Sequence, residues 1–296
     1  MEPVCAVDLG GTRTRVALVG DGGSVLAREV FSTPQDRPRA VTDAIVAAVR
    51  RVSGGSPGAI GVSAAGPLDL AAGAVVAPPN LPHPRIELVA PLEAAFGVSV
   101  TLVNDGGAGA LGEHVHGAGR GCRDLVYVTI STGIGGGVIT DGRLLSGRGG
   151  NAGEIGHITV ETRDGLVCGC GYPNHWEGYC SGRNLPRFYA AQKESGDPYY
   201  DTAEAIFGAA RAGVPAACRF LEAVAVLNAR ALSTLVVAYD PERIVLDGAV
   251  ARAQADLLVG PAVELMEEYL PRPEVVMTRL GGDAPLLGAA EAARRR

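Results

Sequence analysis

Two glycine-rich segments of the chain have the residue types that bind phosphate. The first runs from Asp8 to Arg15 and contains Gly10-Gly11 followed by Thr12. Glycines without Cβ atoms let backbone N–H groups approach an anion, Thr12 adds a hydroxyl donor, and Asp8 offers a carboxylate to Mg²⁺ or to a water in its shell. The same residues also suit an ordinary glycine-rich β-turn, so this segment alone leaves both interpretations open.

The second segment, Ser131–Gly137, has four glycines and two hydroxyl side chains in seven residues. Thr132, Gly133 and Gly135 are its candidates for contacts with phosphate oxygens. No Gly-Lys-Ser/Thr follows either segment, which excludes a Walker A loop, and neither lies at a strand-to-helix transition, which excludes the dinucleotide fingerprint. Two such hairpins facing each other are much less expected by chance than one.

Strands and helices alternate around these segments. The first half is predicted to contain strands at Val4–Leu9, Thr14–Val19 and Ser24–Phe31, a helix at Pro38–Val52, a strand at Ala59–Ala65, a Pro-rich loop, a helix at Leu88–Phe96 and a strand at Val98–Asn104. The second half is predicted to contain strands at Leu125–Ser131, Gly137–Thr140, Arg143–Leu145 and Arg243–Asp247, with helices at Ala216–Ala238 and Gln254–Tyr269. Two α/β halves facing each other imply a cleft. Because open α/β sheets bind ligands at the carboxyl ends of strands, chemistry is expected after Leu9, Asn104 and Ser131.

Composition and charge exclude several classes of protein. With 296 residues, 47% of them hydrophobic and 20% charged, the chain has the make-up of one or two globular domains. A net charge of −6 gives no electrostatic footprint for nucleic acid. We see no basic leader and no apolar stretch near ~18 residues, so we expect a cytoplasmic protein without a membrane partner. The six cysteines fit burial or metal ligation better than a disulfide framework.

A further set of motifs resembles one protein family. In chain order the motifs are Asn104-Asp105 before the small-residue stretch Gly106–Glu113, then Gly153-Glu154-Ile155-Gly156-His157, Cys168-Gly169-Cys170-Gly171 and Trp176-Glu177. With the two glycine segments, which are similar to the duplicated hairpins of actin-like ATPases, they resemble the ROK family (repressors, open reading frames, kinases) over nearly the full length. The resemblance implies an α/β protein with two actin-like (ribonuclease H-like) domains facing a central cleft. The small domain would comprise residues 1–104 plus a C-terminal helix at about 285–296, and the large domain residues 105–284 with a zinc-binding loop.

The resemblance also implies an activity, the transfer of the γ-phosphate of ATP to O6 of glucose with Mg²⁺, as in the glucokinases of the family. Asp105 takes the position of the general base, since the attacking hydroxyl must give its proton to a carboxylate. The family residues that hold the sugar match Asn104, Asp105, Glu154, His157 and Glu177. Taken alone, Asn104-Asp105 would indicate a helix N-cap.

The nucleotide contacts implied by the resemblance come from three segments. They are Asp8, Gly10, Gly11, Thr12 and Arg15 in the first, Thr132, Gly133 and Gly135 in the second, and Gly248 and Ala249 in a strand-turn-helix segment. The family usually has a Gly-Gly pair in that last turn, where small residues permit close backbone approach. Asp247 precedes Gly248 here, a departure that either touches the ribose or caps the following helix, and we favour the cap.

Family members of this kind hold a structural zinc with one His and three Cys. His157, Cys168 and Cys170 match three of those positions, and His175 stands where the fourth Cys is expected. Imidazole can replace thiolate at tetrahedral Zn²⁺, so the hypothesis is a Cys₂His₂ site that is neutral instead of carrying a charge of about −1. The alternatives are recruitment of Cys180 as the fourth ligand, or no zinc at all.

Other functions compete with the leading hypothesis of a glucokinase that binds glucose and ATP. Another ROK hexose kinase, for N-acetylglucosamine, N-acetylmannosamine, mannose or fructose, has the same motifs, which do not separate these sugars. A sugar-responsive ROK repressor needs an N-terminal helix-turn-helix, whereas Asp8 already lies in the first strand. A zinc hydrolase needs an open metal position, which four protein ligands do not leave. The resemblance further suggests a homodimer or a dimer of dimers.

Overall fold

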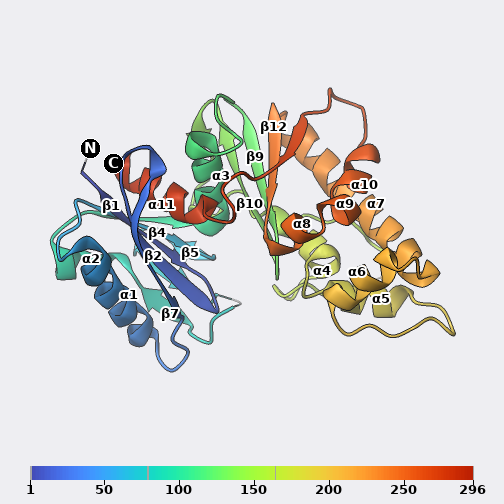
Figure 1. Ribbon diagram of the computed structural model, residues 1–296, viewed down its shortest axis with the longest axis horizontal. Helices are drawn as coiled ribbons and strands as arrows, with labels where there is room; N and C mark the ends of the chain where they lie inside the picture. The colour runs from blue at the N-terminus through green and yellow to red at the C-terminus, as the bar shows by residue number, and fades with distance from the viewer. Residues whose placement is uncertain (1, 79, 164, 296) are drawn as a thin grey trace. The chain divides into compact units, whose positions relative to one another are not determined.

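The structure, a computed structural model, describes residues 2–78, 80–163 and 165–295. The chain divides into two compact units, one formed by Met1–Tyr127, Gly137–Gly153 and Thr278–Arg296, the other by Val128–Gly136 and Glu154–Met277. Strands and helices occur in both units, which confirms the mixed α/β class (Figure 1). The domain boundaries expected from the sequence stay a prediction, and Arg296 of the expected last helix lies outside the described residues.

A five-stranded sheet forms the centre of the first unit. Its order is β3 (Val25–Ser32), β2 (Arg13–Val19), β1 (Val4–Leu9), β4 (Ile60–Ala64) and β8 (Val100–Asn104). The first three strands form an antiparallel meander, while β1, β4 and β8 run parallel. Strand β1 has its predicted bounds, and the other four differ from prediction by at most two residues at either end.

Helices cover both faces of this sheet. Successive residues of a strand point to opposite faces, so Val7 packs in the core with α1 (Pro38–Ser53) and α2 (Val89–Phe96), whereas Ala6 packs with α11 (Ala284–Arg294). Figure 1 shows α1 and α2 together on one side of the sheet. Burial on both faces explains why β1 has a nearly continuous apolar sequence.

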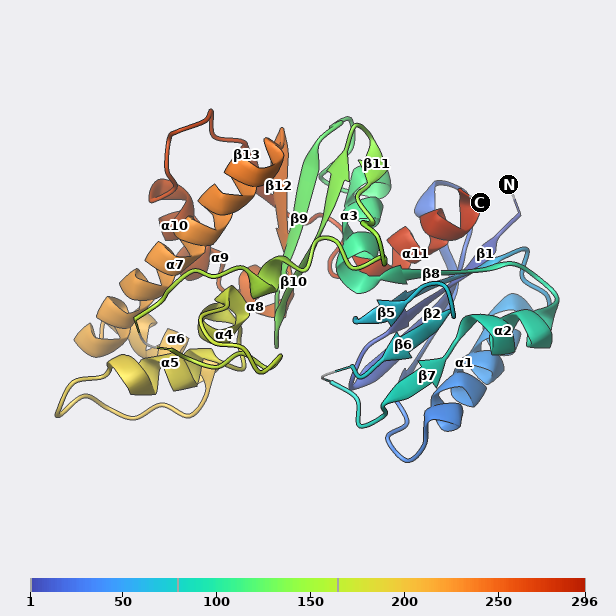
Figure 2. The same cartoon turned by 180° about the vertical axis from the view of Figure 1, so that it is seen from behind.

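A small antiparallel sheet follows β4 in the chain. It consists of β5 (Leu68–Asp69), β6 (Ala74–Val76) and β7 (Arg85–Glu87), visible side by side in Figure 2. The sequence predicts only a Pro-rich loop here. Strands of two or three residues are too short to show the alternation by which a strand is detected.

Helix α3 (Asp105–His116) packs against α11 with the two backbones in contact. A Cβ added at Gly288 would lie 1.7 Å from the Ala108 carbonyl oxygen, and one added at Gly112 would lie 2.1 Å from the Ala284 carbonyl oxygen. Side chains larger than a hydrogen atom do not fit at these two positions. The glycines therefore set the separation of the two helices.

We expect Gly288→Ala to lower the free energy of unfolding by about 1–3 kcal/mol, because the new methyl group overlaps a main-chain oxygen that cannot rotate away. Urea unfolding measures the change. Gly208→Ala in α6 (Ala203–Arg211) is the matched control, since a Cβ there meets nothing within 4 Å, and it should gain up to about 1 kcal/mol in helix propensity. An unchanged unfolding midpoint for Gly288→Ala would contradict the close packing.

A second five-stranded sheet has the order β11 (Arg143–Leu144), β10 (Ile134–Thr140), β9 (Leu125–Ile130), β12 (Arg243–Asp247) and β13 (Glu274–Met277). Strands β10 and β11 pair antiparallel, and β12 and β13 pair parallel. Strand β12 has its predicted bounds, whereas β13 was not predicted. Strand β10 begins three residues earlier than expected, so Gly135 lies inside the strand and not in the preceding turn.

Most of the helices in the second unit surround one long helix. The long helix is α7 (Pro215–Tyr239), which confirms the helix predicted at 216–238, and the helices that pack on it include α4 (Trp176–Cys180), α5 (Leu185–Gln192) and α6. By length and composition α7 could cross a membrane, but 67% of its most apolar stretch is buried inside the protein, as in a core helix.

The single helix predicted for residues 254–269 is wrong. After α8 (Ala249–Ala253), this stretch forms the short helices α9 (Ala255–Leu258) and α10 (Gly260–Glu264), and no helix continues beyond Glu264 among the described residues up to Met277. Gly260 weakens the helix, and Pro261 lacks the N–H that would bond to the preceding turn. Apolar residues at helical spacing are therefore present without a continuous helix.

Candidate functional site

The first glycine segment forms the turn between β1 and β2. Leu9 pairs with Thr14 across the ladder, and the Gly10 N–H donates to the Arg13 carbonyl oxygen at 3.1 Å. Gly11 and Thr12 thus lie at the tip of a tight hairpin. The hairpin follows the carboxyl end of β1, which is where ligands of such sheets bind.

Asp8 and Arg15 lie opposite each other in the β1–β2 ladder and form an ion pair. Asp8 Oδ2 accepts hydrogen bonds from Arg15 Nε at 2.9 Å and Nη2 at 2.7 Å, and Oδ1 accepts one from the Ser63 hydroxyl at 3.2 Å. Arg15 also donates to the Gly282 carbonyl oxygen at 2.9 Å and to Asp283 at 3.1 Å. The guanidinium is therefore held between two carboxylates, and it fixes the orientation of Asp8.

The second glycine segment forms a turn at residues 131–133 between β9 and β10, closed by a 2.8 Å hydrogen bond from the Ser131 N–H to the Gly133 carbonyl oxygen. Glu177, in the first turn of α4, lies directly against it. Glu177 Oε2 accepts from the Ile134 N–H at 2.9 Å, and a Cβ on Gly133 would lie 2.4 Å from the same oxygen. A predicted phosphate contact and a predicted sugar contact are thus adjacent within one unit.

Asn104 and Asp105 lie at the junction of β8 and α3. Asn104 Oδ1 accepts from the Gly106 N–H at 2.9 Å and the Gly107 N–H at 3.3 Å, so Asn104 is the N-cap of α3. Asp105 is the first helical residue, and its Oδ1 accepts from the Gly106 N–H at 2.8 Å. The cap is therefore Asn104, whereas the predicted catalytic residue is Asp105. The Asp105 carboxylate lies at the helix N-terminus, where the partial positive charge favours the ionised form.

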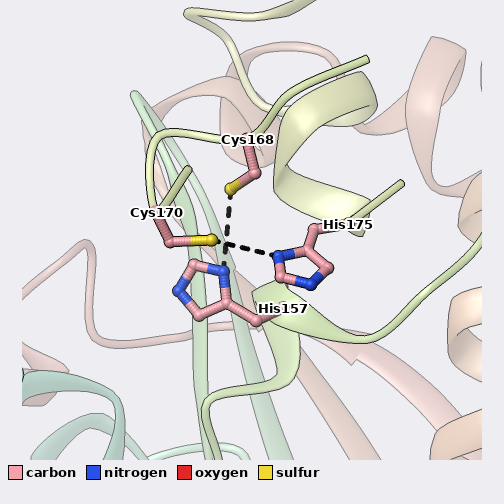
Figure 3. A group of neighbouring side chains, drawn as sticks. All are labelled: His157, Cys168, Cys170 and His175. Atoms are coloured by element: carbon pink, nitrogen blue, oxygen red, sulfur yellow. Dashed lines mark hydrogen bonds between the residues drawn. The ribbon is translucent and has the colours of Figure 1, made fainter. Parts of the chain in front are cut away.

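The four predicted zinc ligands converge in the second unit (Figure 3). One donor atom from each of His157, Cys168, Cys170 and His175 lies within 4.8 Å of the others. Cys168 Sγ is 3.6 Å from His157 Nδ1, and Cys170 Sγ is 3.2 Å from His175 Nδ1. Ligand atoms of a tetrahedral zinc ion lie about 3.3–3.8 Å apart, given Zn–N near ~2.0 Å and Zn–S near ~2.3 Å. The donor set and its spacing therefore fit zinc.

Neighbouring backbone and a buried tryptophan hold the ligand loop in place. Thr159, two residues after His157, forms an antiparallel bridge with His175. Trp176 is fully buried, and its indole N–H donates to Asn228 Oδ1 of α7 at 2.7 Å. The ligand loop is thus fastened to the long core helix right beside His175.

Burial also changes the acid–base properties of this cluster. It raises the pKa of the Cys168 thiol to about 12, and together with His157 it lowers the pKa of the His175 imidazole, which favours the neutral form that binds metals. Cys168 Sγ lies 3.4 Å from Glu177 Oε1, so Glu177 contacts both the cluster and the second glycine turn. Cys180, the alternative ligand, is fully buried in α4 and does not belong to the group of four.

His157 presents its two ring nitrogens to different partners. Nδ1 faces Cys168, whereas Nε2 lies 3.8 Å from Glu154 Oε2. Such an imidazole can bind a metal through one nitrogen and offer its other N–H elsewhere. Two predicted sugar contacts, Glu154 and His157, are thereby adjacent.

The turn after β12 contains Asp247, which is buried. Its Oδ1 accepts from the Gly248 N–H at 2.6 Å and from the Arg252 guanidinium. Gly248 has φ +97°, and a Cβ there would lie 2.2 Å from the Ile130 carbonyl oxygen, so only glycine fits. Gly248 is the N-cap residue of α8, so the predicted cap at Asp247 is wrong, and Asp247 instead stabilises the turn that leads into the helix.

Several residues that contact the first hairpin were not predicted from the sequence. Thr33 and Gln35 donate hydrogen bonds to its carbonyl oxygens, and Ser63 and Asp283 hold Asp8 and Arg15. These residues belong to none of the motifs, and they meet the hairpin only through the sheet pairing and α11. Sequence spacing carries no signal for such contacts.

Comparison with known proteins gives a family and related kinases. Residues 4–296 match the model of the ROK family. The chain is 34% identical to the glucokinase of Streptomyces coelicolor over 309 residues, covering 97% of this chain and 96% of that one. Among solved structures, the ROK hexokinase from Thermus thermophilus is 35% identical with a TM-score of 0.84, covering 99% of this chain and 98% of that one. The ROK glucokinase from Streptomyces griseus, solved with glucose and AMPPNP, is 34% identical with a TM-score of 0.82, covering 99% and 100%.

Proposed function

The chain belongs to the ROK family, and from this membership we infer that it is an ATP-dependent hexose kinase, a glucokinase that transfers the γ-phosphate of ATP to O6 of glucose. It has the two-domain actin-like fold of the ROK sugar kinases. The observation that carries the inference is the match to glucokinases along nearly the whole chain, within which the acidic, histidine and glycine residues described above occur in the family's order.

Asp105 acts as the general base of the transfer. The glucose O6 attacks the γ-phosphorus, the bond to the bridging β-phosphate oxygen breaks, ADP leaves, and the O6 proton passes to the Asp105 carboxylate. Around the reacting hydroxyl, the carboxylates of Glu154 and Glu177 accept from sugar hydroxyls. The Asn104 amide and the His157 ring N–H donate hydrogen bonds to sugar hydroxyl oxygens.

The glycine turns hold the phosphate chain of ATP. The amides and hydroxyls that bind it come from Gly10, Gly11, Thr12, Thr132, Gly133 and Gly135, and the turn at Gly248-Ala249 accommodates the adenosine. Asp8, directly or through a water, would hold Mg²⁺, which would supply positive charge against the phosphates. Arg15 acts on the nucleotide through Asp8, which it orients.

The His157, Cys168, Cys170 and His175 cluster is a structural zinc site. Zinc supplies folding energy to the loop that it closes. This loop carries His157 at its beginning, and Glu177 follows His175 by two residues, so a rigid loop keeps two sugar contacts in place. With two thiolates the site is neutral overall. We also propose a cytoplasmic homodimer, or a dimer of such dimers, in keeping with the family.

A coupled assay across a panel of hexoses tests the proposed function. With ATP, we expect glucose to give the highest kcat/KM among glucose, N-acetylglucosamine, N-acetylmannosamine, mannose and fructose. Replacement of ATP by polyphosphate in parallel reactions defines the phosphoryl donor. A tenfold higher kcat/KM for another sugar would assign the chain to a different hexose kinase, and the absence of ATP-dependent turnover with every sugar would reject the kinase assignment.

A further inference from the structure

Side chains from the segment after β3 bind the carbonyl groups of the first glycine hairpin. The Thr33 hydroxyl donates to the Gly10 carbonyl oxygen at 2.7 Å, and Gln35 Nε2 donates to the Gly11 carbonyl oxygen at 2.9 Å. The Thr33 N–H donates to the Thr12 carbonyl oxygen at 3.0 Å. Three consecutive carbonyls of the hairpin therefore point toward residues 33–35.

These carbonyl contacts also determine the direction of the N–H groups in the same peptide planes. In a trans peptide the N–H of one residue points opposite to the carbonyl of the residue before it. Fixing the Gly10 and Gly11 carbonyls thus turns the N–H groups of Gly11 and Thr12 away from residues 33–35. Neither N–H has a hydrogen-bond acceptor in the described part of the chain.

The second glycine turn has the same arrangement with different donors. The Ser131 and Thr132 carbonyl oxygens accept from the N–H groups of Gly182 at 2.8 Å and Arg183 at 3.2 Å. The N–H groups of Thr132 and Gly133 are directed away from those donors and likewise have no acceptor among the residues that the structure describes. Both turns thus present a pair of consecutive amides, the arrangement that binds an anion.

We propose that Thr33 and Gln35 are positioning residues that aim the Gly11 and Thr12 amides at the phosphates of the nucleotide. The inference rests on the proposed kinase function. In the second turn, backbone N–H groups hold the carbonyl oxygens, whereas in the first turn two side chains hold the Gly10 and Gly11 carbonyl oxygens. Side-chain substitution can therefore change the direction of the amides only in the first turn. Thr33 is buried and shares a 2.9 Å hydrogen bond with the Thr14 hydroxyl, and Gln35 Nε2 makes a second bond to the Thr33 carbonyl oxygen at 2.9 Å.

Thr33→Val removes the hydroxyl at nearly constant volume and tests the proposal. We expect the Kd of AMPPNP and the KM for ATP to rise about threefold to tenfold, the range that corresponds to one lost hydrogen bond, with the KM for glucose unchanged within about twofold. Thr33→Ser, which keeps the hydroxyl, should restore the ATP values. Thr42→Val is the matched control, because the buried Thr42 hydroxyl also donates to a carbonyl oxygen of the first unit, that of Glu87, at 2.7 Å. It should lower stability without changing the KM for ATP.

Gln35→Met provides a second variant whose folding is not at risk, because Gln35 is exposed. It should weaken AMPPNP binding in the same direction, again without changing the KM for glucose. If wild-type protein binds AMPPNP and phosphorylates glucose while Thr33→Val and Gln35→Met bind the analogue as tightly, the positioning role is overturned and the kinase function stands. An equal rise of KM for ATP and glucose also overturns it. A wild-type protein that neither binds AMPPNP nor phosphorylates a hexose overturns both.

Discussion

Replacing Asp105 by alanine is expected to lower kcat for glucose phosphorylation by about 10²–10⁴-fold, the usual effect of losing a general base. Asp105 is the first residue of α3, and its carboxylate accepts a hydrogen bond from the Gly106 N–H, so the side chain is held in place before sugar binds. Its loss leaves the O6 proton without an acceptor in the transition state. Because this interaction matters most in the transition state, KM for glucose should change far less than kcat.

Two further variants test whether the loss of kcat comes from the missing base. Asp105→Asn keeps the size and the backbone contact but cannot accept the proton, so its kcat should fall as far as that of Asp105→Ala. Asp43→Asn is the control, since Asp43 is an exposed carboxylate on α1 that pairs with Arg39 at 3.7 Å, and its kcat should stay at the wild-type value. Retention of activity within about tenfold in Asp105→Ala would contradict the assignment of the base.

Removing the His175 imidazole is expected to weaken zinc binding by at least about 100-fold, because even a residue that only supports a ligand costs ~10–100-fold. When zinc is well above its Kd, a 100-fold loss of affinity removes about 2.7 kcal/mol of stabilisation. His175→Ala should therefore show a lower zinc content by elemental analysis and a lower Tm. Chelator treatment should lower the Tm of the wild-type protein and leave that of the zinc-free variant unchanged.

The chain offers both a rescue and a control for this experiment. His175→Cys should retain zinc, since it restores the three-thiolate set of the family. Cys218→Ala removes a thiol of α7 that donates to the Ala210 carbonyl oxygen and lies outside the cluster, so it should leave the zinc content unchanged. Full zinc retention in His175→Ala would exclude His175 as a ligand.

The strands that carry the glycine turns were predictable because local sequence determines them. Strand β1 and its turn follow from an apolar run ended by Asp8-Leu9-Gly10-Gly11, and β12 follows from Arg243–Asp247 in the same way. The helix predicted at 254–269 failed because Gly260 and Pro261 override the apolar spacing around them. Periodicity describes which side of an element would be buried, and it does not say that the backbone can continue.

The residues of the site likewise differ in how far they could be predicted from the sequence. The four-residue metal cluster could be anticipated because the chain resembles the ROK family at His157, Cys168 and Cys170, with His175 where the fourth ligand is expected. The contacts of Thr33 and Gln35 could not be anticipated, since common polar side chains reach a hairpin more than 20 residues earlier. Glu177 was predicted to contact sugar, but its position against Gly133 depends on how α4 packs on the turn, which no motif encodes.

The contact between Gly288 and α3 affects the order in which the parts of the protein can fold during synthesis. Helix α11 comes last in the chain, yet it packs directly against β1, the first strand, and α3. At ~5–20 residues per second a ribosome needs about 15 seconds to a minute to pass from the first strand to this helix. The segment Glu154–Met277 is synthesised before α11, so the second unit can begin to fold while the first still exposes the apolar face that α11 will cover.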